Sequence, residues 1–245
     1  MRVYRYLTGL AVGPVFCPLS MLKEAEAYRD KQQEYFRFRR DDIIELIPPG
    51  ERTRVLEVGA AEGSTLVDLK RAGKAAEVVG VELLAMPGSG QNHPEIDRFV
   101  IADVEQKNLD FPPESFDIVI CGDLLEHLRD PWSAFDYVVG FLRPGGRIIV
   151  SLPNILYWRA IGRILLGDFR YAPSGVLDRT HLRFFCRKNM IDLIKSAKLG
   201  VMQVEPSFRR QKALRMDRLL NALSLGLAER FLAQQYLIVA EKPRA

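Results

Sequence analysis

The chain has 245 residues, of which 48% are hydrophobic and 27% charged, a balance typical of a soluble globular protein with one sizeable core. The net charge of +4 is mild and no Lys/Arg tract is interleaved with aromatic residues, so no nucleic-acid partner is expected. Three widely spaced cysteines (Cys17, Cys121 and Cys186) argue against a disulfide framework and against a CxxC site, and they fit a reducing cytoplasm.

The first part of the chain, 1–50, is expected to be a helical extension or cap. Arg2 and Arg5 precede the apolar segment "YLTGLAVGPVFCPL", which resembles a signal peptide but contains Pro14 and lacks a small-x-small cleavage site. The segment is too short to span a bilayer, so an extension or a surface-associating segment is favoured. From 22 to 47, apolar residues among many charges predict one or two helices, which end at the following Pro-Pro-Gly.

From residue 51 onward, apolar runs of strand length alternate with segments of helix length. Five runs rich in Val and Ile are expected to form strands, at 54–58, 76–83, 98–103, 116–123 and 146–153. Helices are expected between them, at 64–72, in a short piece near 86–95, and at 131–142. The runs barely alternate with polar residues, as is typical of parallel strands buried on both faces. This pattern predicts an α/β fold with a Rossmann-like, mostly parallel sheet and helices on both faces.

The end of the chain is expected to complete this sheet. A helix is predicted at 187–200, and strands at 201–206 and 235–243 bring the sheet to seven strands. The final strand is predicted to run antiparallel, inserted beside the one before it. Two insertions interrupt the domain, one on the acceptor side at 154–186 and an amphipathic helical one at 207–234.

The second insertion is basic at its start and leucine-rich after it. The basic residues are Arg209, Arg210, Lys212, Arg215 and Arg218. A basic amphipathic helix can lie on an anionic membrane, or it can bury its leucines as a lid or at a homodimer contact. The first interpretation would give a cytoplasmic protein with peripheral membrane contact and a lipid-linked acceptor.

The stretch "RVLEVGAAEGSTLVDL" joins a buried strand to a helix through a short glycine-bearing turn. Ligands bind beyond the carboxyl ends of strands in open α/β sheets, and Glu57 is expected to lie there. Gly59 and Gly63 allow unusual dihedral angles and a close approach to a ligand. Ala61 stands where a dinucleotide fingerprint has its second glycine, and Glu62 adds negative charge, so NAD and FAD are disfavoured. A carboxylate at Glu57 suits a ligand that bears a cation.

Acidic residues end the next two strands as well. Glu82 is placed to hydrogen-bond the hydroxyls of a ribose, and Asp103 to lie near an adenine amino group. Five motifs in register, "VLEVGAAEG", "VVGVEL", "VIADVEQ", "FDIVICGDLLEHLRDP" and "LRPGGRIIVSLPN", resemble those of the class I S-adenosylmethionine-dependent methyltransferases. The chain looks most like the small-molecule group that includes ubiquinone-biosynthesis O-methyltransferases. The resemblance covers 52–153 well and 178–242 more loosely.

The resemblance implies S-adenosyl-L-methionine as the cofactor, and no metal site is expected. The implied reaction is an in-line displacement, in which a nucleophile on a small-molecule, sugar or lipid-linked acceptor attacks the sulfonium methyl group. Cys121 is interpreted as a small core residue rather than a nucleophile. The cofactor-binding residues are expected at the turn and at the ends of the first four strands: Glu57, Gly59, Ala61, Gly63, Glu82, Leu83, Asp103, Val104, Cys121 and Asp123.

An oxygen nucleophile benefits from a general base, and histidine suits neutral pH. His127 follows Glu126 at the mouth of the fourth strand, where a capping or packing role has equal weight. His181 lies in "VLDRTHLRFF", a region that often lines the acceptor pocket in the resembling family, and it is favoured over His127. Asp178 lies three residues before His181, so one helical turn could place both on one face; a structural network is the alternative.

Two other functions stay open, a nicotinamide-dependent oxidoreductase on a related sheet and a non-catalytic protein that binds the cofactor. The aromatic residues Tyr157, Trp158, Phe169 and Tyr171 could line an acceptor pocket or pack as a helical hairpin. Methylation at oxygen is favoured, while nitrogen, carbon and the identity of the acceptor stay open.

Overall fold

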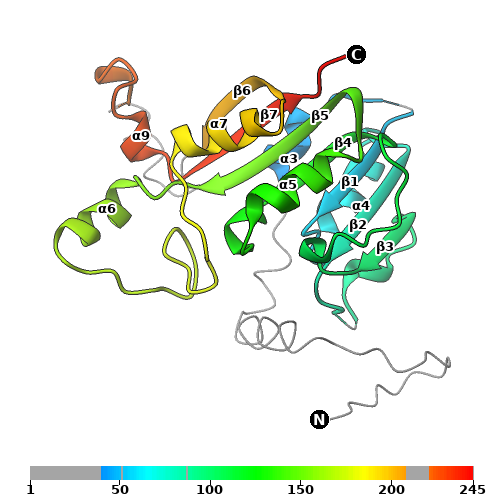
Figure 1. Ribbon diagram of the computed structural model, residues 1–245, viewed down its shortest axis with the longest axis horizontal. Helices are drawn as coiled ribbons and strands as arrows, with labels where there is room; N and C mark the ends of the chain where they lie inside the picture. Colours follow the sequence, from blue (N-terminus) through cyan, green and yellow to red (C-terminus); the bar gives the residue numbers. More distant parts are fainter. Residues whose placement is uncertain (1–39, 51, 87, 208–220, 245) are drawn as a thin grey trace, which may run out of the picture. The chain divides into compact units, whose positions relative to one another are not determined.

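The computed structural model describes residues 40–50, 52–86, 88–207 and 221–244. Its sheet has the order β3-β2-β1-β4-β5-β7-β6 (Figure 1). β1 to β5 run parallel, and β7 lies antiparallel between β5 and β6. The predicted seven-stranded sheet with an antiparallel last strand is therefore confirmed. The strands are β1 (Arg54–Val58), β2 (Glu77–Glu82), β3 (Arg98–Ile101), β4 (Phe116–Gly122), β5 (Leu142–Pro153), β6 (Gly200–Ser207) and β7 (Gln235–Glu241).

Helices and short 3-10 turns connect the strands. Near 86–95, where a short helix was expected, the described residues form only the three-residue turn η1 (Gly90–Asn92), because Gly88 precedes it, Gly90 begins it and Pro94 follows it closely. The helices are α3 (Asp41–Leu46), α4 (Ser64–Arg71), α5 (Pro131–Val139), α6 (Trp158–Leu165), α7 (Arg187–Ser196) and α9 (Glu229–Leu232). The 3-10 turns are η1 (Gly90–Asn92), η2 (Val104–Gln106) and η3 (Leu125–His127).

Alternate residues of each central strand pack into two different cores, one on each face of the sheet. In β1, Leu56 joins the core that contains Phe135 of α5 and Met190 of α7. Its neighbour Val55 joins the other core, with Leu66 of α4. Since successive side chains of a strand point to opposite faces, helices must cover both sides (Figure 1). This double burial explains why the strand sequences read as continuous apolar runs.

The core of the domain begins before residue 51. Ile43 and Ile47, in and just after α3, are 0% and 1% exposed and pack in the same core as Val55. α3 therefore belongs to the hydrophobic core on one face of the sheet, where it packs with residues of β1 and β4. The rest of the 1–50 extension predicted from the sequence lies outside the described residues.

The 207–234 insertion is not one continuous helix in its described part. The chain turns at 224–228, where Leu225 and Gly226 have φ values of 52° and 83°, before α9 begins. The five basic residues at the start of this insertion, from Arg209 to Arg218, fall within 208–220, outside the described residues. Across the described segments, no helix is both long and apolar enough to cross a membrane.

The 154–186 insertion contains a single helix, α6, rather than the helical hairpin considered from the sequence. It has a small core of its own, formed by Tyr157, Ala160, Val176 and Leu177. Phe169 packs edge-on against Tyr171 and Phe184, with ring centroids 5.5 and 5.7 Å away. This local packing fixes the loop that carries His181.

Candidate functional site

The turn after β1 has left-handed backbone at three alternate positions. Gly59, Ala61 and Gly63 have φ values of 79°, 48° and 81°. The turn is held against β2, because the Gly59 and Ala60 amides donate to the Val81 carbonyl at 2.9 and 3.0 Å. Glycine adopts this backbone without strain, whereas alanine is disfavoured there. Ala61 therefore keeps the glycine conformation of the motif at a small cost in stability.

Glu82 is held by the backbone of two loops. Its Oε2 accepts from the Ala61 amide at 2.9 Å, and its Oε1 accepts from the Leu83 amide at 2.8 Å and the Leu84 amide at 3.4 Å. Burial raises the pKa of Glu82, and these three hydrogen bonds act in the opposite direction. A carboxylate has about four acceptor sites, so Glu82 keeps capacity for further donors such as ribose hydroxyls.

Glu57 is a buried carboxyl group at the end of β1. It is 5% exposed, and its Oε2 has no hydrogen-bond partner among the residues that the structure describes. Burial raises the pKa of Glu57 to about 8; Arg40 and the Thr65 hydroxyl oppose this shift, and Glu82 adds to it. A buried acceptor without a donor is costly, so this oxygen points to a ligand that brings a donor or a positive charge.

Arg40 joins this region, although the sequence analysis did not select it. The residue is only 8% exposed, and its side chain donates to Asp123 Oδ2 at 2.9 Å and Ser151 Oγ at 3.0 Å. It also pairs with Asp42 at 3.0 Å. Burial alone would lower the pKa of Arg40, but the carboxylates of Asp123 and Asp42 outweigh it and raise the pKa. Arg40 lies in a charged run, "RFRRDD", where nothing local distinguishes a buried arginine from exposed ones.

The remaining predicted cofactor residues lie at the ends of β3 and β4. Asp103 accepts from the Glu105 amide at 2.9 Å and so caps η2, which begins with the buried Val104. Asp123 is occupied by Arg40, Ser151 and Gln235. Cys121 is fully buried in the core, and burial raises its thiol pKa to about 12. Any cofactor contact at Cys121 would therefore come from the backbone, and the thiol is not a nucleophile.

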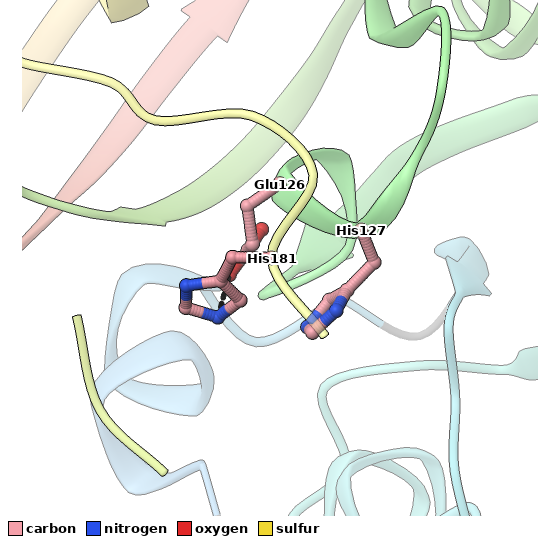
Figure 2. Close-up of side chains that lie close together, drawn as sticks. All are labelled: Glu126, His127 and His181. Atoms are coloured by element: carbon pink, nitrogen blue, oxygen red, sulfur yellow. Dashed lines mark ion pairs between the residues drawn. The ribbon is translucent and has the colours of Figure 1, made fainter. Parts of the chain in front are cut away.

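The two candidate histidines lie together. His127 of η3 and His181 of the loop before α7 have ring centroids 4.9 Å apart (Figure 2). The carboxylate of Glu126 is the third member of the group, with Oε1 4.0 Å from His181 Nε2. The backbone connects the two segments, since the Leu182 amide donates to the Glu126 carbonyl at 2.8 Å. The fold thus gathers residues that are more than fifty positions apart in the sequence.

Asp178 supports this loop and does not share a helical face with His181. Residues 178–180 form a turn, in which the Asp178 carboxylate accepts from the Thr180 amide at 2.9 Å and the Thr180 hydroxyl at 2.7 Å. The His181 amide donates to the Asp178 carbonyl at 3.0 Å. This arrangement fits the structural alternative considered from the sequence and makes Asp178 a positioning residue.

Comparison with known proteins agrees with this geometry. A methyltransferase domain family matches residues 56–150, the segment that holds Glu57, Glu82, Asp103 and His127. A ubiquinone biosynthesis O-methyltransferase of Bartonella tribocorum is 25% identical over 223 residues, which cover 84% of this chain and 87% of that protein. Residues 56–150 therefore form a class I S-adenosylmethionine-dependent methyltransferase domain. This domain assignment replaces the nicotinamide-dependent alternative.

Two further comparisons concern a partial match in sequence and a match in fold. Phosphoethanolamine N-methyltransferase 3 of Arabidopsis thaliana is 33% identical over 111 residues, but these span 44% of this chain and only 22% of that protein. The crystal structure of an S-adenosylmethionine-dependent methyltransferase from Archaeoglobus fulgidus has a TM-score of 0.59 at 17% identity, and the match covers 92% of this chain and all of that one. The second comparison shows a shared fold.

The cofactor of the class I methyltransferases is S-adenosyl-L-methionine, and the residues at the ends of β1 and β2 fit it. The buried Glu57 Oε2 can accept a hydrogen bond from the ammonium group of the cofactor. Gly59 carries no Cβ, and a Cβ there would lie 3.2 Å from Leu124 Cδ1. The absence of a side chain at Gly59 therefore leaves space beside the turn for a ligand. Glu82 presents further acceptor sites beside the turn.

Proposed function

We propose that this protein transfers a methyl group from S-adenosyl-L-methionine to an oxygen atom of a small-molecule, sugar or lipid-linked acceptor. The observation that carries the proposal is the buried oxygen of Glu57, which has no partner among the described residues and lies at the ligand-binding edge of the sheet. When bound, the cofactor supplies a methyl carbon made electrophilic by the adjacent sulfonium. The chain itself orients the reactants and excludes water, and both effects accelerate in-line displacement.

Each end of the cofactor is assigned to particular residues in this proposal. Glu57 accepts from the ammonium group, and Glu82 accepts from the ribose hydroxyls. Asp103 and the backbone at Val104 lie on the adenine side, at the end of the neighbouring strand β3. The support is their common position at the carboxyl ends of adjacent parallel strands.

The acceptor side is assigned to η3 and the loop before α7. Leu124 Cδ1 lies 3.2 Å from the position that a Cβ on Gly59 would occupy, and Leu124 is followed closely by Glu126 and His127, so the histidine group lies near the cofactor turn. His181 and His127 are proposed to promote loss of the acceptor hydroxyl proton. Oxygen is favoured because relatives that the chain covers at length are named O-methyltransferases.

The decisive experiment measures cofactor binding and turnover separately. Titration calorimetry with S-adenosyl-L-methionine is expected to give micromolar affinity, on the order of −8 kcal/mol. Formation of S-adenosylhomocysteine is then followed with phenolic, sugar and lipid-linked hydroxyl acceptors. Cofactor binding without turnover on any acceptor would favour the non-catalytic alternative. Absence of cofactor binding would overturn the proposal as a whole.

A lipid-linked acceptor is supported by the exposed leucines of the 207–234 insertion. Leu223, Leu225 and Leu227 are 73%, 92% and 74% exposed. Such an apolar surface, which follows a basic segment in the sequence, can contact an anionic membrane. Co-sedimentation with anionic vesicles tests this contact. Equal sedimentation of the protein with anionic vesicles, with neutral vesicles and without vesicles would remove it. A homodimer that covers the same leucines is the competing outcome, which sedimentation equilibrium would detect.

A further inference from the structure

Two histidines and one carboxylate converge at the acceptor side of the site. Glu126, His127 and His181 each offer one ligand atom, and these atoms lie within 4.8 Å of one another (Figure 2). Glu126 and His181 are 1% and 7% exposed, whereas His127 is half-buried. The side chains of Glu126 and His181 are therefore shielded from solvent, whereas His127 is partly exposed to it.

The hydrogen bonds of both imidazoles define which nitrogen can act as a ligand. His127 Nδ1 lies 3.1 Å from the Thr180 carbonyl oxygen, and His181 Nδ1 lies 3.1 Å from the Val176 carbonyl oxygen. A carbonyl oxygen can only accept, so each Nδ1 must carry the hydrogen. In the neutral imidazole, Nε2 is then the nitrogen with the lone pair. Histidine ligands of metal ions commonly donate the other ring N–H to a backbone carbonyl in this way.

The separations suit a metal ion better than a direct hydrogen bond. His181 Nε2 and Glu126 Oε1 are 4.0 Å apart, which is beyond hydrogen-bond distance. Ligands at about 2.1 Å from a tetrahedral zinc ion lie roughly 3.4 Å from each other. A closing movement on the order of 1 Å would bring this group to that geometry.

The backbone holds the group in place without an ion. The amides of Leu182 and Arg183 donate to the Glu126 carbonyl at 2.8 and 3.0 Å, and this joins the loop of His181 to η3. The Asp178 carboxylate fixes the turn just before His181 through Thr180. The ligand atoms are thus presented by two segments that are linked through main-chain hydrogen bonds.

We propose that Glu126 Oε1, His127 Nε2 and His181 Nε2 bind a divalent first-row transition-metal ion. Two imidazoles and one carboxylate favour such ions over Mg²⁺ or Ca²⁺, which prefer oxygen ligands. Three protein ligands leave at least one position open, as in catalytic metal sites. No metal site is expected from the sequence, which has no CxxC or zinc-finger spacing, and His181 lies more than fifty positions after Glu126 and His127.

The role of the ion rests on the proposed methyl transfer, although its binding does not. An acceptor hydroxyl in the open position would have a lowered pKa and would release its proton to solvent. Its oxygen then forms the bond to the methyl carbon, while the carbon–sulfur bond breaks and its electron pair stays on sulfur. The products are the methyl ether and S-adenosylhomocysteine. His127 and His181 are metal ligands in this scheme, rather than the general bases expected from the sequence.

The test measures metal binding directly, with Co²⁺ as the probe. The full-length protein is treated with a chelator, dialysed and titrated with Co²⁺ while its visible absorption is recorded. One Co²⁺ per chain, displaced by Zn²⁺ and unaffected by excess Mg²⁺, is the expected result. His181→Ala and Glu126→Gln should each weaken Co²⁺ binding at least tenfold. His93→Ala is the matched control, because His93 is the remaining one of the three histidines and lies beside Arg71, outside the proposed site.

The outcomes separate the metal proposal from the proposed function. Titration with S-adenosyl-L-methionine on each variant reports whether the cofactor site is folded, and Glu126→Gln preserves side-chain volume if the alanine variant does not fold. Wild-type protein that binds the cofactor but shows no Co²⁺ absorption band would overturn the metal site alone. Equal Co²⁺ affinity in wild type and both variants would do the same. Metal binding without any turnover would leave the site intact and remove the methyl-transfer role.

Discussion

The Ala61 amide donates a 2.9 Å hydrogen bond to Glu82 Oε2, so the turn after β1 is tied to the last residue of β2. The same carboxylate holds the amide of Leu83 at 2.8 Å. Glu82 therefore shapes the cofactor turn as well as offering acceptors to a ligand. Removing it should affect binding through both roles.

Glu82→Ala is expected to weaken binding of S-adenosyl-L-methionine by roughly 1.5–3 kcal/mol, the usual scale for hydrogen bonds to a charged group. This corresponds to about a 10- to 150-fold rise in Kd, which calorimetry would measure. Glu77→Ala is the matched control, since Glu77 lies at the opposite end of the same strand and pairs with Arg54. An unchanged isotherm for Glu82→Ala would refute the ribose assignment.

The strained backbone at Ala61 predicts a stabilising substitution. Ala61→Gly should raise the free energy of unfolding by about 0.5–1 kcal/mol, because relief of the left-handed conformation exceeds the added chain entropy of glycine. Thermal unfolding would show a higher Tm. Ala60→Gly should lower the Tm instead, since Ala60 is buried and lacks a positive φ. Equal shifts for both variants would contradict this explanation.

Alanine substitutions at Gly63 and Gly73 distinguish the cost of backbone strain from the cost of a steric clash. Both have positive φ, at 81° and 64°, but an added Cβ would lie 2.6 Å from Ile96 Cδ1 at Gly63 and would meet nothing within 4 Å at Gly73. Gly73→Ala should destabilise the protein by about 1 kcal/mol through strain alone. Gly63→Ala should cost more, about 2–3 kcal/mol, and should also weaken cofactor binding. Denaturant unfolding would measure both, and equal losses would exclude the steric contribution.

The buried Glu57 predicts a pH dependence of stability in the protein without cofactor. Its pKa is raised from 4.5 to about 8 on folding, so the folded state holds a proton that the unfolded state releases between these values. The stabilising contribution is complete below pH 4.5 and is lost as the pH rises to about 8, by a few kcal/mol in all. Glu57→Gln should remove this dependence in denaturant unfolding, and an unchanged slope would show that Glu57 does not titrate in this range.

Cofactor binding should also release a proton from Glu57. An ammonium group beside the carboxyl favours its ionised form, so binding at pH 7 is expected to expel the proton that burial retains. Calorimetric titrations in buffers with different ionisation enthalpies should therefore give different apparent enthalpies. The difference should vanish in Glu57→Gln, which is also expected to bind more weakly. Identical enthalpies in all buffers would place the ammonium away from Glu57.

The sequence by itself determined the sheet and the cofactor edge, because both depend on local patterns. The run "RVLEV" coincides with β1 at 54–58, and the acidic residues Glu57 and Glu82 lie at or next to the last residue of two strands that pair side by side. Buried parallel strands must be apolar throughout, and a turn with positive φ favours small residues. The predicted boundaries differ from the observed ones by a few residues, as at β5, which begins at Leu142 instead of 146, and at α5, which ends at Val139 instead of 142.

Only the tertiary structure decided which distant side chains meet. Arg40 reaches Asp123 across 83 positions, and His181 reaches Glu126 from a separate loop. Nothing in the spacing of these residues encodes their contact, since it arises from the packing of α3 beneath the sheet and from main-chain bonds between the loop and η3. Asp178 shows the same limit, because a three-residue spacing suggested a shared helix face where the chain instead makes a turn. Long-range contacts follow from the burial of whole elements, and that burial is a property of the complete fold.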